Sequence, residues 1–217
     1  SGTEQLIFFE EANIAGAPLP FVTISTVGPA LMSHGSALQK DRFLPGIAAG
    51  EIHFAIGYSE PDAGSDLATL KTAAKVEPDG FVVNGNKLWT SGVEAADFVW
   101  LAARTDPERP RHKGISLLIV DTRTPGFSHT PIPTVGNSTA ATYYDNVQVP
   151  REMLVGELHG GWKLITDQLN HERLGLGSWA DKVFAPFRRV LLWAKAPDEQ
   201  GRRAIDQPWV RRALADC

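Results

Sequence analysis

Residues 53–66 read HFAIGYSEPDAGSD, and at the start of this stretch the hydrophobic pattern of the chain changes its period. From His53 to about Val149 apolar and polar residues alternate, which is typical of β-strands with one buried face. The segments that fit are 53–57, 71–77, 81–84, 87–90, 97–104, 115–121, 127–131 and 141–149. Pro78-Asp79-Gly80 and Asn84-Gly85 carry the residue types that tight hairpin turns require. This region is therefore predicted to be an antiparallel β-sandwich or barrel.

Helical patterns flank this β region on both sides. Helices are predicted over residues 5–14, 23–34 and 36–44, from about residue 160, and over 184–194. Pro45 is expected to end or kink the third of them. The order predicts an α+β multidomain fold: a partial N-terminal helical domain (1–52), a middle β domain (53–157) and the start of a C-terminal helical bundle (158–217). Helical pattern continues to both ends without caps, so we expect a segment of a longer protein.

Composition, charge and the lack of certain motifs argue against several classes of protein. The chain has 217 residues, of which 43% are hydrophobic, and its net charge of −4 gives no reason to expect a nucleic-acid partner. The longest apolar runs, such as Ile115–Val120, are too short to span a membrane. No secretory signal opens the chain, and the single cysteine, Cys217, cannot form an intrachain disulfide, so a cytoplasmic location is expected. His171-Glu172 lacks a second histidine at metal-site spacing, and no metal is predicted.

Three short stretches stand out for their polar residues. Tyr58–Asp66 follows an apolar strand directly, and such a loop can aim amides and hydroxyls at an electron-rich ligand. It can equally be a strand-end turn capped by Ser65 or Asp66. The second stretch, Asn84–Gly92, carries a tryptophan and two hydroxyls, which core packing and a turn also explain.

The third stretch, Gln168–Leu174, places polar and charged residues in succession within a helix. A solvated helix face explains this pattern as well as a binding site does. Consecutive helical residues splay apart, so at most one or two of three consecutive polar residues in this stretch can share a site.

Together, the three stretches resemble the acyl-CoA dehydrogenase family of flavoenzymes. The loop is similar to that family's flavin-binding Glu-Pro-x-Ala-Gly-Ser-Asp turn, and the second stretch resembles its Gly-x-Lys-x-Trp-x-Ser/Thr strand. The order of helices, β domain and helices matches the family's three-domain plan over nearly the whole chain. The resemblance implies FAD-dependent α,β-dehydrogenation of an acyl-CoA thioester to the trans-2-enoyl-CoA, as in fatty-acid or steroid β-oxidation.

The resemblance also implies which residues would contact the ligands. The positions it implies for FAD are Ile56, Tyr58, Ser59, Ser65, Trp89, Thr90 and Ser91. Main chain around Tyr58 and the Ser59 hydroxyl would meet the pyrimidine edge of the flavin, and Ser91 would offer its hydroxyl to N5. The positions it implies for the acyl-CoA are Ser65, Asn170, His171 and Arg173.

Removal of a proton α to a thioester carbonyl needs a base, and a glutamate serves if burial raises its pKa. One of the two positions that the family uses for this glutamate lies on the helix after the β domain, just before an arginine. Glu172, which precedes Arg173, matches that position. The resemblance therefore implies Glu172 as the catalytic base, and a surface carboxylate is the alternative.

The expected partner subunit is inferred from a family motif that this chain lacks. In the family, residues that contact a neighbouring subunit's FAD usually follow an Arg-x-x-Phe-Gly motif, whereas residues 202–209 read RRAIDQPW. This departure favours an unequal second subunit over a homo-oligomer. The nearest resemblance is to subunits of heterotetrameric bacterial dehydrogenases that act on steroid side-chain CoA thioesters and pass electrons to a separate acceptor.

Three other functions remain open at this point. The chain can be a catalytically silent or assembly subunit, or an acyl-CoA oxidase that passes electrons to oxygen. From a different class, it can be a non-enzymatic β-sandwich recognition module.

Overall fold

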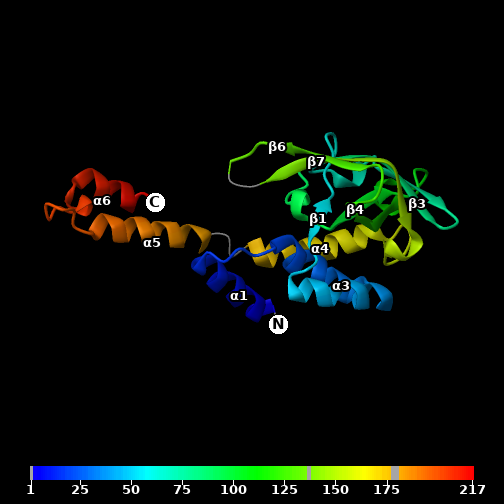
Figure 1. Ribbon diagram of the computed structural model, residues 1–217. Helices are drawn as coiled ribbons and strands as arrows, with labels where there is room; N and C mark the ends of the chain where they lie inside the picture. The colour runs from blue at the N-terminus through cyan, green and yellow to red at the C-terminus, as the bar shows by residue number, and fades with distance from the viewer. Residues whose placement is uncertain (1, 136–137, 177–180) are drawn as a thin grey trace. The chain divides into compact units, whose positions relative to one another are not determined.

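A sheet of eight strands lies at the centre of residues 20–172 in the computed structural model, which describes residues 2–135, 138–176 and 181–217. The strands are β1 (Phe54–Gly57), β2 (Ala73–Glu77), β3 (Gly80–Lys87), β4 (Phe98–Arg104), β5 (Ile115–Asp121), β6 (Phe127–Ile132), β7 (Thr139–Pro150) and β8 (Leu154–Val155). Their order across the sheet is β6-β7-β3-β2-β4-β5-β8, and β1 pairs with β4 off this path. Figure 1 shows the β6–β7 pair, with β1 next to β4. The predicted α+β class is confirmed.

Two strand pairings differ from the antiparallel arrangement that the alternation predicts. β1 runs parallel to β4, starting with Phe54 opposite Phe98, and β2 meets β4 in parallel at Ala73 and Arg104. The alternating pattern specifies which side chains share a face but not the direction of a strand. The β2–β3 hairpin lies between β1 and β4 in the sequence. This long connection lets β4 enter the sheet from the same end as β1, and the two strands therefore run parallel.

Of the two predicted hairpin turns, one is confirmed and one is wrong. β2 and β3 form an antiparallel hairpin across Pro78-Asp79. Asn84-Gly85 instead lies inside β3, where the register against β7 shifts. A Cβ at Gly85 would approach Thr72 to 2.7 Å, and the φ of Gly85 is 144°. Glycine is therefore needed here for a bulge and a close approach rather than for a chain reversal.

Helices flank the sheet in the sequence, as predicted. They are α1 (Gly2–Ala15), the π-helical turn η1 (Thr23–Val27), α2 (Gly28–His34), α3 (Ala37–Ala49), α4 (Gly161–Leu176), α5 (Asp181–Lys195) and α6 (Pro208–Ala215). Of the two effects expected of Pro45, an end of the third helix is wrong, since α3 continues through the proline and closes at Gly50 with a φ of 74°. Phe43 and Ile47, on either side of the proline, are both buried, so the apolar face continues past it.

Contacts divide the chain into two units. One is Pro20–Glu172, and the other joins Ser1–Leu19 with Arg173–Cys217. Within the second unit, α1 contacts α5. None of the helices in the described ranges is long and apolar enough to cross a membrane.

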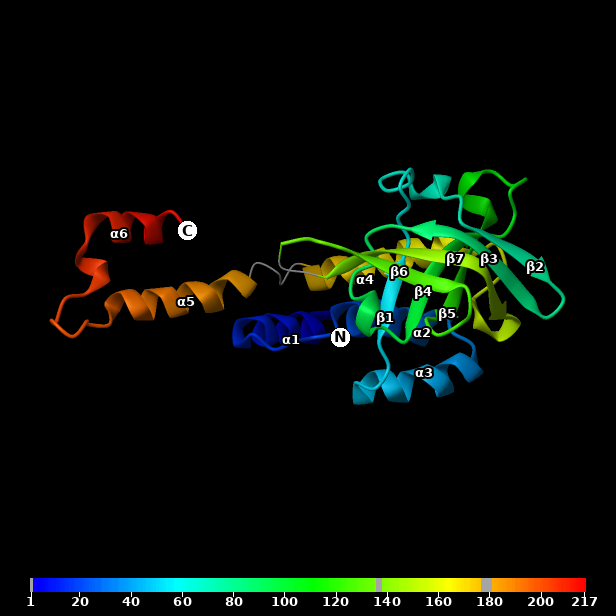
Figure 2. The same ribbon diagram turned by 45° about the horizontal axis from the view of Figure 1, so that its top comes forward.

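β1 lies beside β4 in the sheet (Figure 2). An aromatic cluster packs these two strands against α3. The ring of Phe43 lies 5.6 Å from that of Phe54 and 5.1 Å from that of Phe98, and Phe54 lies 6.5 Å from Trp100, measured between centroids. The Phe54 N–H also donates to Thr23 Oγ1 at 2.9 Å, which attaches η1 to the start of β1. The short strand β1 is thus held by a strand neighbour and two helical neighbours.

A buried ion pair attaches the loop after β1 to the end of β3. Lys87 Nζ donates to Glu60 Oε1 at 2.8 Å and to the main-chain oxygen of Tyr58 at 3.0 Å. The side chains of Lys87 and Glu60 are 0% and 6% exposed. The Glu60 carboxylate also accepts the N–H groups of Lys71 at 2.6 Å and Thr72 at 2.8 Å. These contacts define the path of the main chain from Tyr58 to Glu60.

Both members of this pair are charged at neutral pH. Burial lowers the pKa of Lys87 to about 8, and the Glu60 carboxylate opposes that shift. Burial by itself would raise the pKa of Glu60, but the Lys87 charge and the hydrogen bonds hold this pKa below its ordinary value.

Helix α4 begins against β5 with no room for a side chain. A Cβ at Gly161 would lie 2.8 Å from the backbone of Ser116. Further along the helix, Ile165 and Gln168 are fully buried, and Glu172 is half-buried. Their spacing of three and four places them on one face of α4, the face turned toward the protein.

We expect Lys87→Met to lower the free energy of unfolding by about 3–5 kcal/mol, because it leaves the Glu60 carboxylate buried without its counter-ion. Glu60→Gln should also destabilise the fold, since it strands the buried ammonium. The double variant should cost less than the sum of the single changes by more than about 1 kcal/mol, as for groups in direct contact. Denaturant unfolding of the full-length protein measures all three variants, and additive losses would contradict the coupling.

Candidate active site

Tyr58 is the first residue of the loop after β1, and its side chain points into the protein. Trp100 Nε1 donates to the Tyr58 hydroxyl at 3.1 Å and to Gln168 Oε1 at 2.9 Å. The Tyr58 hydroxyl donates to the same Gln168 oxygen. The three side chains come from the loop after β1, from β4 and from α4, and all are buried. We call this closed set of hydrogen bonds the Tyr58–Trp100–Gln168 triangle.

The triangle fixes the orientation of the Gln168 amide. An indole N–H can only donate, so the amide oxygen must face Trp100 and the amide nitrogen must face away from it. Gln168 is 0% exposed, and its Nε2 has no hydrogen-bond partner among the described residues. An unpaired buried donor costs about 1–3 kcal/mol, so packing stability alone does not account for glutamine at this position.

Glu172 lies one helical turn beyond Gln168. Burial raises the pKa of the Glu172 carboxyl above its ordinary value. Burial also raises the pKa of the Tyr58 hydroxyl; the hydrogen bond from Trp100 opposes this rise and the negative charge of Glu172 adds to it. The hydrogen bond from the Tyr58 hydroxyl to Gln168 brings the first and third polar stretches together here. A carboxylate with a raised pKa in such a setting is suited to general-base chemistry.

The segment after β3 brings the second polar stretch to the same loop. The Leu88 N–H donates to the Ser59 main-chain oxygen at 2.8 Å. The predicted strand 87–90 is wrong beyond Lys87, where β3 ends, because Trp89 adopts a φ of 63°. This left-handed conformation is strained for a bulky residue, and the Trp89 side chain is 55% exposed. Strained backbone that holds a large ring at the surface is a feature of binding sites.

The hydroxyls of Thr90 and Ser91 differ in burial. Thr90 is fully buried, its Oγ1 lies 3.3 Å from Thr142 Oγ1, and its N–H donates to the Ala140 oxygen. Ser91 is exposed and donates to Thr139 Oγ1 at 3.3 Å, a long hydrogen bond that a rotating hydroxyl can exchange for another. A ligand on the surface can therefore meet the Ser91 hydroxyl but not that of Thr90.

The remaining candidate residues differ in how far they are exposed. Ile56, Ser59 and His171 are half-buried, whereas Ser65, Asn170 and Arg173 are exposed.

Several residues that build the site were not predicted from the sequence: Glu60, Lys87, Trp100 and Gln168. For Gln168 a signal was present, since it lies three residues after Ile165 and four before Glu172 and so belongs to the buried face of α4. Trp100 lies in a strand whose side chains are buried on both faces, and such a strand gives no sign of which residue has a polar partner.

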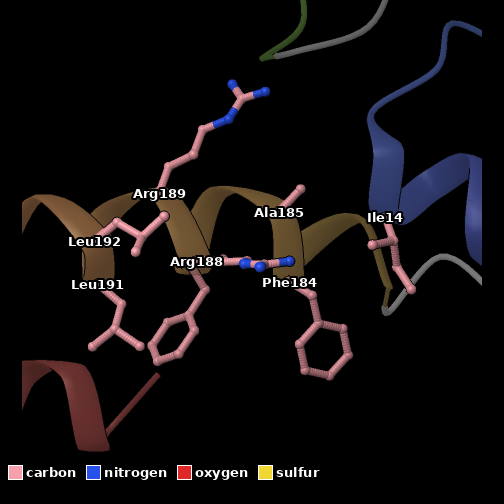
Figure 3. Close-up of a pocket in the computed structure, with 8 residues that line it drawn as sticks. Ile14, Phe184, Ala185, Arg188, Arg189, Leu191 and Leu192 are labelled. Carbon is pink, nitrogen blue, oxygen red and sulfur yellow. The ribbon is translucent and has the colours of Figure 1, made fainter.

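A separate hollow lies in the other unit. It measures about 420 Å³ and is lined by Ile14 of α1 and by residues of α5 that include Phe184, Arg188 and Leu192 (Figure 3). Its described lining contains neither a carboxylate nor a nucleophile, and we assign no chemistry to it. Within the ranges that the structure covers, no three His, Cys, Asp or Glu side chains gather as a metal site.

Models of one protein family match this chain in three consecutive parts. The N-terminal-domain model of acyl-CoA dehydrogenases matches residues 1–51, the middle-domain model matches residues 55–147, and the C-terminal-domain model matches residues 159–217.

Known relatives show the same likeness. The acyl-CoA dehydrogenase FadE29 of Mycobacterium tuberculosis is 54% identical over 215 residues, which make up 98% of this chain and 55% of that protein. The solved structure titled Tcur3481-Tcur3483 steroid ACAD has a TM-score of 0.89 at 52% identity and covers 100% of this chain and 55% of its own. The ChsE4-ChsE5 complex from Mycobacterium tuberculosis has a TM-score of 0.86 at 53% identity and covers 100% of this chain and 56% of its own.

The chain thus spans about half the length of the relatives it matches. The three domain models follow one another in the family's order, and high identity extends over the full length of the chain. This chain belongs to the acyl-CoA dehydrogenase family.

Proposed function

We propose that the protein containing this chain is an FAD-dependent dehydrogenase that converts an acyl-CoA thioester to the trans-2-enoyl-CoA, with Glu172 as the base. The observation that carries the proposal is the half-buried Glu172 carboxyl, whose pKa is raised by burial and which lies one helical turn beyond Gln168, the residue that accepts a hydrogen bond from the Tyr58 hydroxyl. Its position on α4 matches one of the two places where the family carries this glutamate.

The reaction requires a base held against a weakly acidic C–H bond. Glu172 accepts the α-proton of the thioester, and partial burial makes its carboxylate a better proton acceptor than an exposed one. α4 carries Glu172 at a set position in the chain's fold, and holding a base in place reduces the orientational freedom that is lost when the proton is transferred.

FAD, when bound, accepts the β-hydride. The residues present fit a flat aromatic ligand of this kind. Trp89 exposes a ring on a strained backbone. Ser91 follows it two residues later, and Ser59 belongs to the loop after β1. Packing of the Trp89 ring against a planar ligand gives a reason for a conformation that is otherwise unfavourable.

The assembly and the acyl group form the second part of the proposal. One similar solved structure is described as a steroid ACAD, and another as a complex of two named chains. Residues 202–209 lack the family's Arg-x-x-Phe-Gly motif, and Arg202 and Arg203 pair within this chain with Asp198 and Asp206, both at 2.9 Å. We therefore infer an unequal second subunit, a steroid side-chain CoA thioester as substrate, and a separate electron-transfer acceptor. Ser65, Asn170, His171 and Arg173 are the proposed acyl-CoA contacts, of which helix geometry lets at most one or two of the three on α4 reach the ligand together.

Glu172→Gln in the full-length protein with its partner subunit should keep the flavin spectrum but lower kcat by a factor of about 10² or more, because the amide cannot accept the α-proton. Steady-state turnover and the visible spectrum measure the two effects separately.

Asp167→Asn is the matched control for this change, since it replaces another carboxylate on α4. Asp167 pairs with His34 at 3.3 Å and is partly exposed, so its loss should leave turnover near that of the unaltered protein. Near-normal turnover of Glu172→Gln would place the base elsewhere.

Trp89→Gly should separate flavin binding from stability. Glycine adopts a φ of 63° without strain, so the flavin-free protein should unfold at the same or a higher denaturant concentration. Loss of the ring should weaken flavin retention by about tenfold, or ~1.4 kcal/mol. Flavin content after dialysis and denaturant midpoints give both quantities, and Trp89→Phe should retain more flavin than the glycine variant. Unchanged flavin retention in Trp89→Gly would remove Trp89 from the site.

Anaerobic addition of a panel of acyl-CoA thioesters tests the substrate. A steroid side-chain CoA should bleach the flavin absorbance of the co-purified complex faster than straight-chain acyl-CoAs do. Faster bleaching by straight chains would contradict the steroid assignment, and stoichiometric peroxide release in air would identify an oxidase. Purification of a flavin-bound homo-oligomer with full activity would contradict the unequal partner.

A further inference from the structure

We propose that Tyr58, Trp100 and Gln168 are positioning residues for Glu172, because their hydrogen-bonded triangle holds the turn of α4 that carries this carboxylate. The inference rests on the proposed role of Glu172 as the base. It assigns a task to polar side chains that neither the flavin-loop motif nor the catalytic glutamate accounts for.

The triangle joins three elements at one point. Trp100 comes from β4, in the middle of the sheet, and its Nε1 lies 3.1 Å from the Tyr58 hydroxyl and 2.9 Å from Gln168 Oε1. The main-chain oxygen of Tyr58 is itself held by Lys87 Nζ at 3.0 Å, so the loop side of the triangle is anchored independently. α4 is therefore attached, through Gln168, to a strand and to a loop that are each fixed by other contacts.

The attachment point lies next to the base. Gln168 and Glu172 are four residues apart, and side chains at this spacing are neighbours on a helix surface. A rotation or shift of α4 at Gln168 therefore moves Glu172 by a similar amount. The same spacing places the Glu172 side chain on the side of α4 that carries Gln168 and so faces the triangle.

The composition of the triangle favours positioning over core stability. Gln168 is fully buried and leaves Nε2 without a partner among the described residues, which is unfavourable. Replacing buried polar partners by apolar groups of similar shape is often neutral or stabilising. A directional set of hydrogen bonds, unlike an apolar contact, specifies one rotation of the helix.

Several ionisable groups of the described part of the chain lie on or near the turn that carries Glu172. On α4 itself they include Asp167 and the chain neighbours His171 and Arg173, and Asp167 pairs with His34 at the end of α2. From the loop after β1 the group is Tyr58, whose hydroxyl burial keeps protonated. Because burial is the cause of the raised pKa of Glu172, a change in the position of α4 that exposes the carboxyl must lower this pKa.

Two single substitutions break the triangle but leave the indole N–H of Trp100 with one acceptor. Tyr58→Phe leaves Trp100 bonded to Gln168 Oε1, and Gln168→Met leaves Trp100 bonded to the Tyr58 hydroxyl. Gln39→Met is the matched control, because Gln39 is also buried and donates to the main-chain oxygens of Glu152 at 2.7 Å and Leu154 at 2.8 Å.

In the full-length complex, both triangle variants should lower kcat by about ten- to hundredfold, the loss expected from misplacing a reacting group by about 1 Å, and change KM less than twofold. The acidic limb of their kcat–pH profiles should move to lower pH, toward the ordinary glutamate value, as Glu172 becomes more exposed. Gln39→Met should reduce thermal stability while it leaves kcat and the acidic limb unchanged.

Wild-type kcat and an unmoved acidic limb in both Tyr58→Phe and Gln168→Met would overturn the inference while leaving Glu172 as the base. An active Glu172→Gln would instead remove the base and this inference together. If one triangle variant fails to fold, the other decides the question, and Trp100→Phe, which retains the contact between Tyr58 and Gln168, provides a third. A shift of the acidic limb in Gln39→Met equal to that in the triangle variants would also overturn the inference.

Discussion

The contact between the buried Lys87 ammonium and the Glu60 carboxylate is the constraint on which the site depends. It attaches the loop after β1 to the end of β3, and the same ammonium holds the Tyr58 carbonyl. Neither group can leave the other without leaving a charge in an apolar interior, so the loop has one favourable path. That path turns the Tyr58 side chain toward Trp100 and Gln168 and places Ser59 beside the segment that carries Trp89.

From this loop the constraint extends to α4. Gly161 lets the helix begin in contact with β5, and Gln168 attaches its middle to the sheet. Glu172 follows one turn later, at a depth where water reaches only part of the carboxyl. Its raised pKa is thus a consequence of how the helix lies on the sheet rather than of a neighbouring acid, because burial is its cause.

The order of helices, sheet and helices, the three polar stretches and the position of Glu172 on a helix were predictable, because each depends on local periodicity or a short motif. The predictions of local structure were wrong where tertiary packing overrides the usual conformational preference of a residue. Asn84-Gly85 is typical of a turn but lies in β3, where Thr72 leaves no room for a Cβ. Pro45 is typical of a helix end, yet the buried face of α3 continues past it. Trp89 interrupts a predicted strand with a left-handed residue.

The amino-acid sequence by itself determined the class of fold, the family resemblance and the identity of the proposed base, because these depend on residue types at fixed spacings along the chain. The tertiary structure decided that β1 runs parallel to β4, that Lys87 and Glu60 form a buried pair, and that Gln168 meets Tyr58 and Trp100. These contacts join residues between 27 and 110 positions apart. Only the folded chain brings such residues together, and burial then determines their charge and their partners.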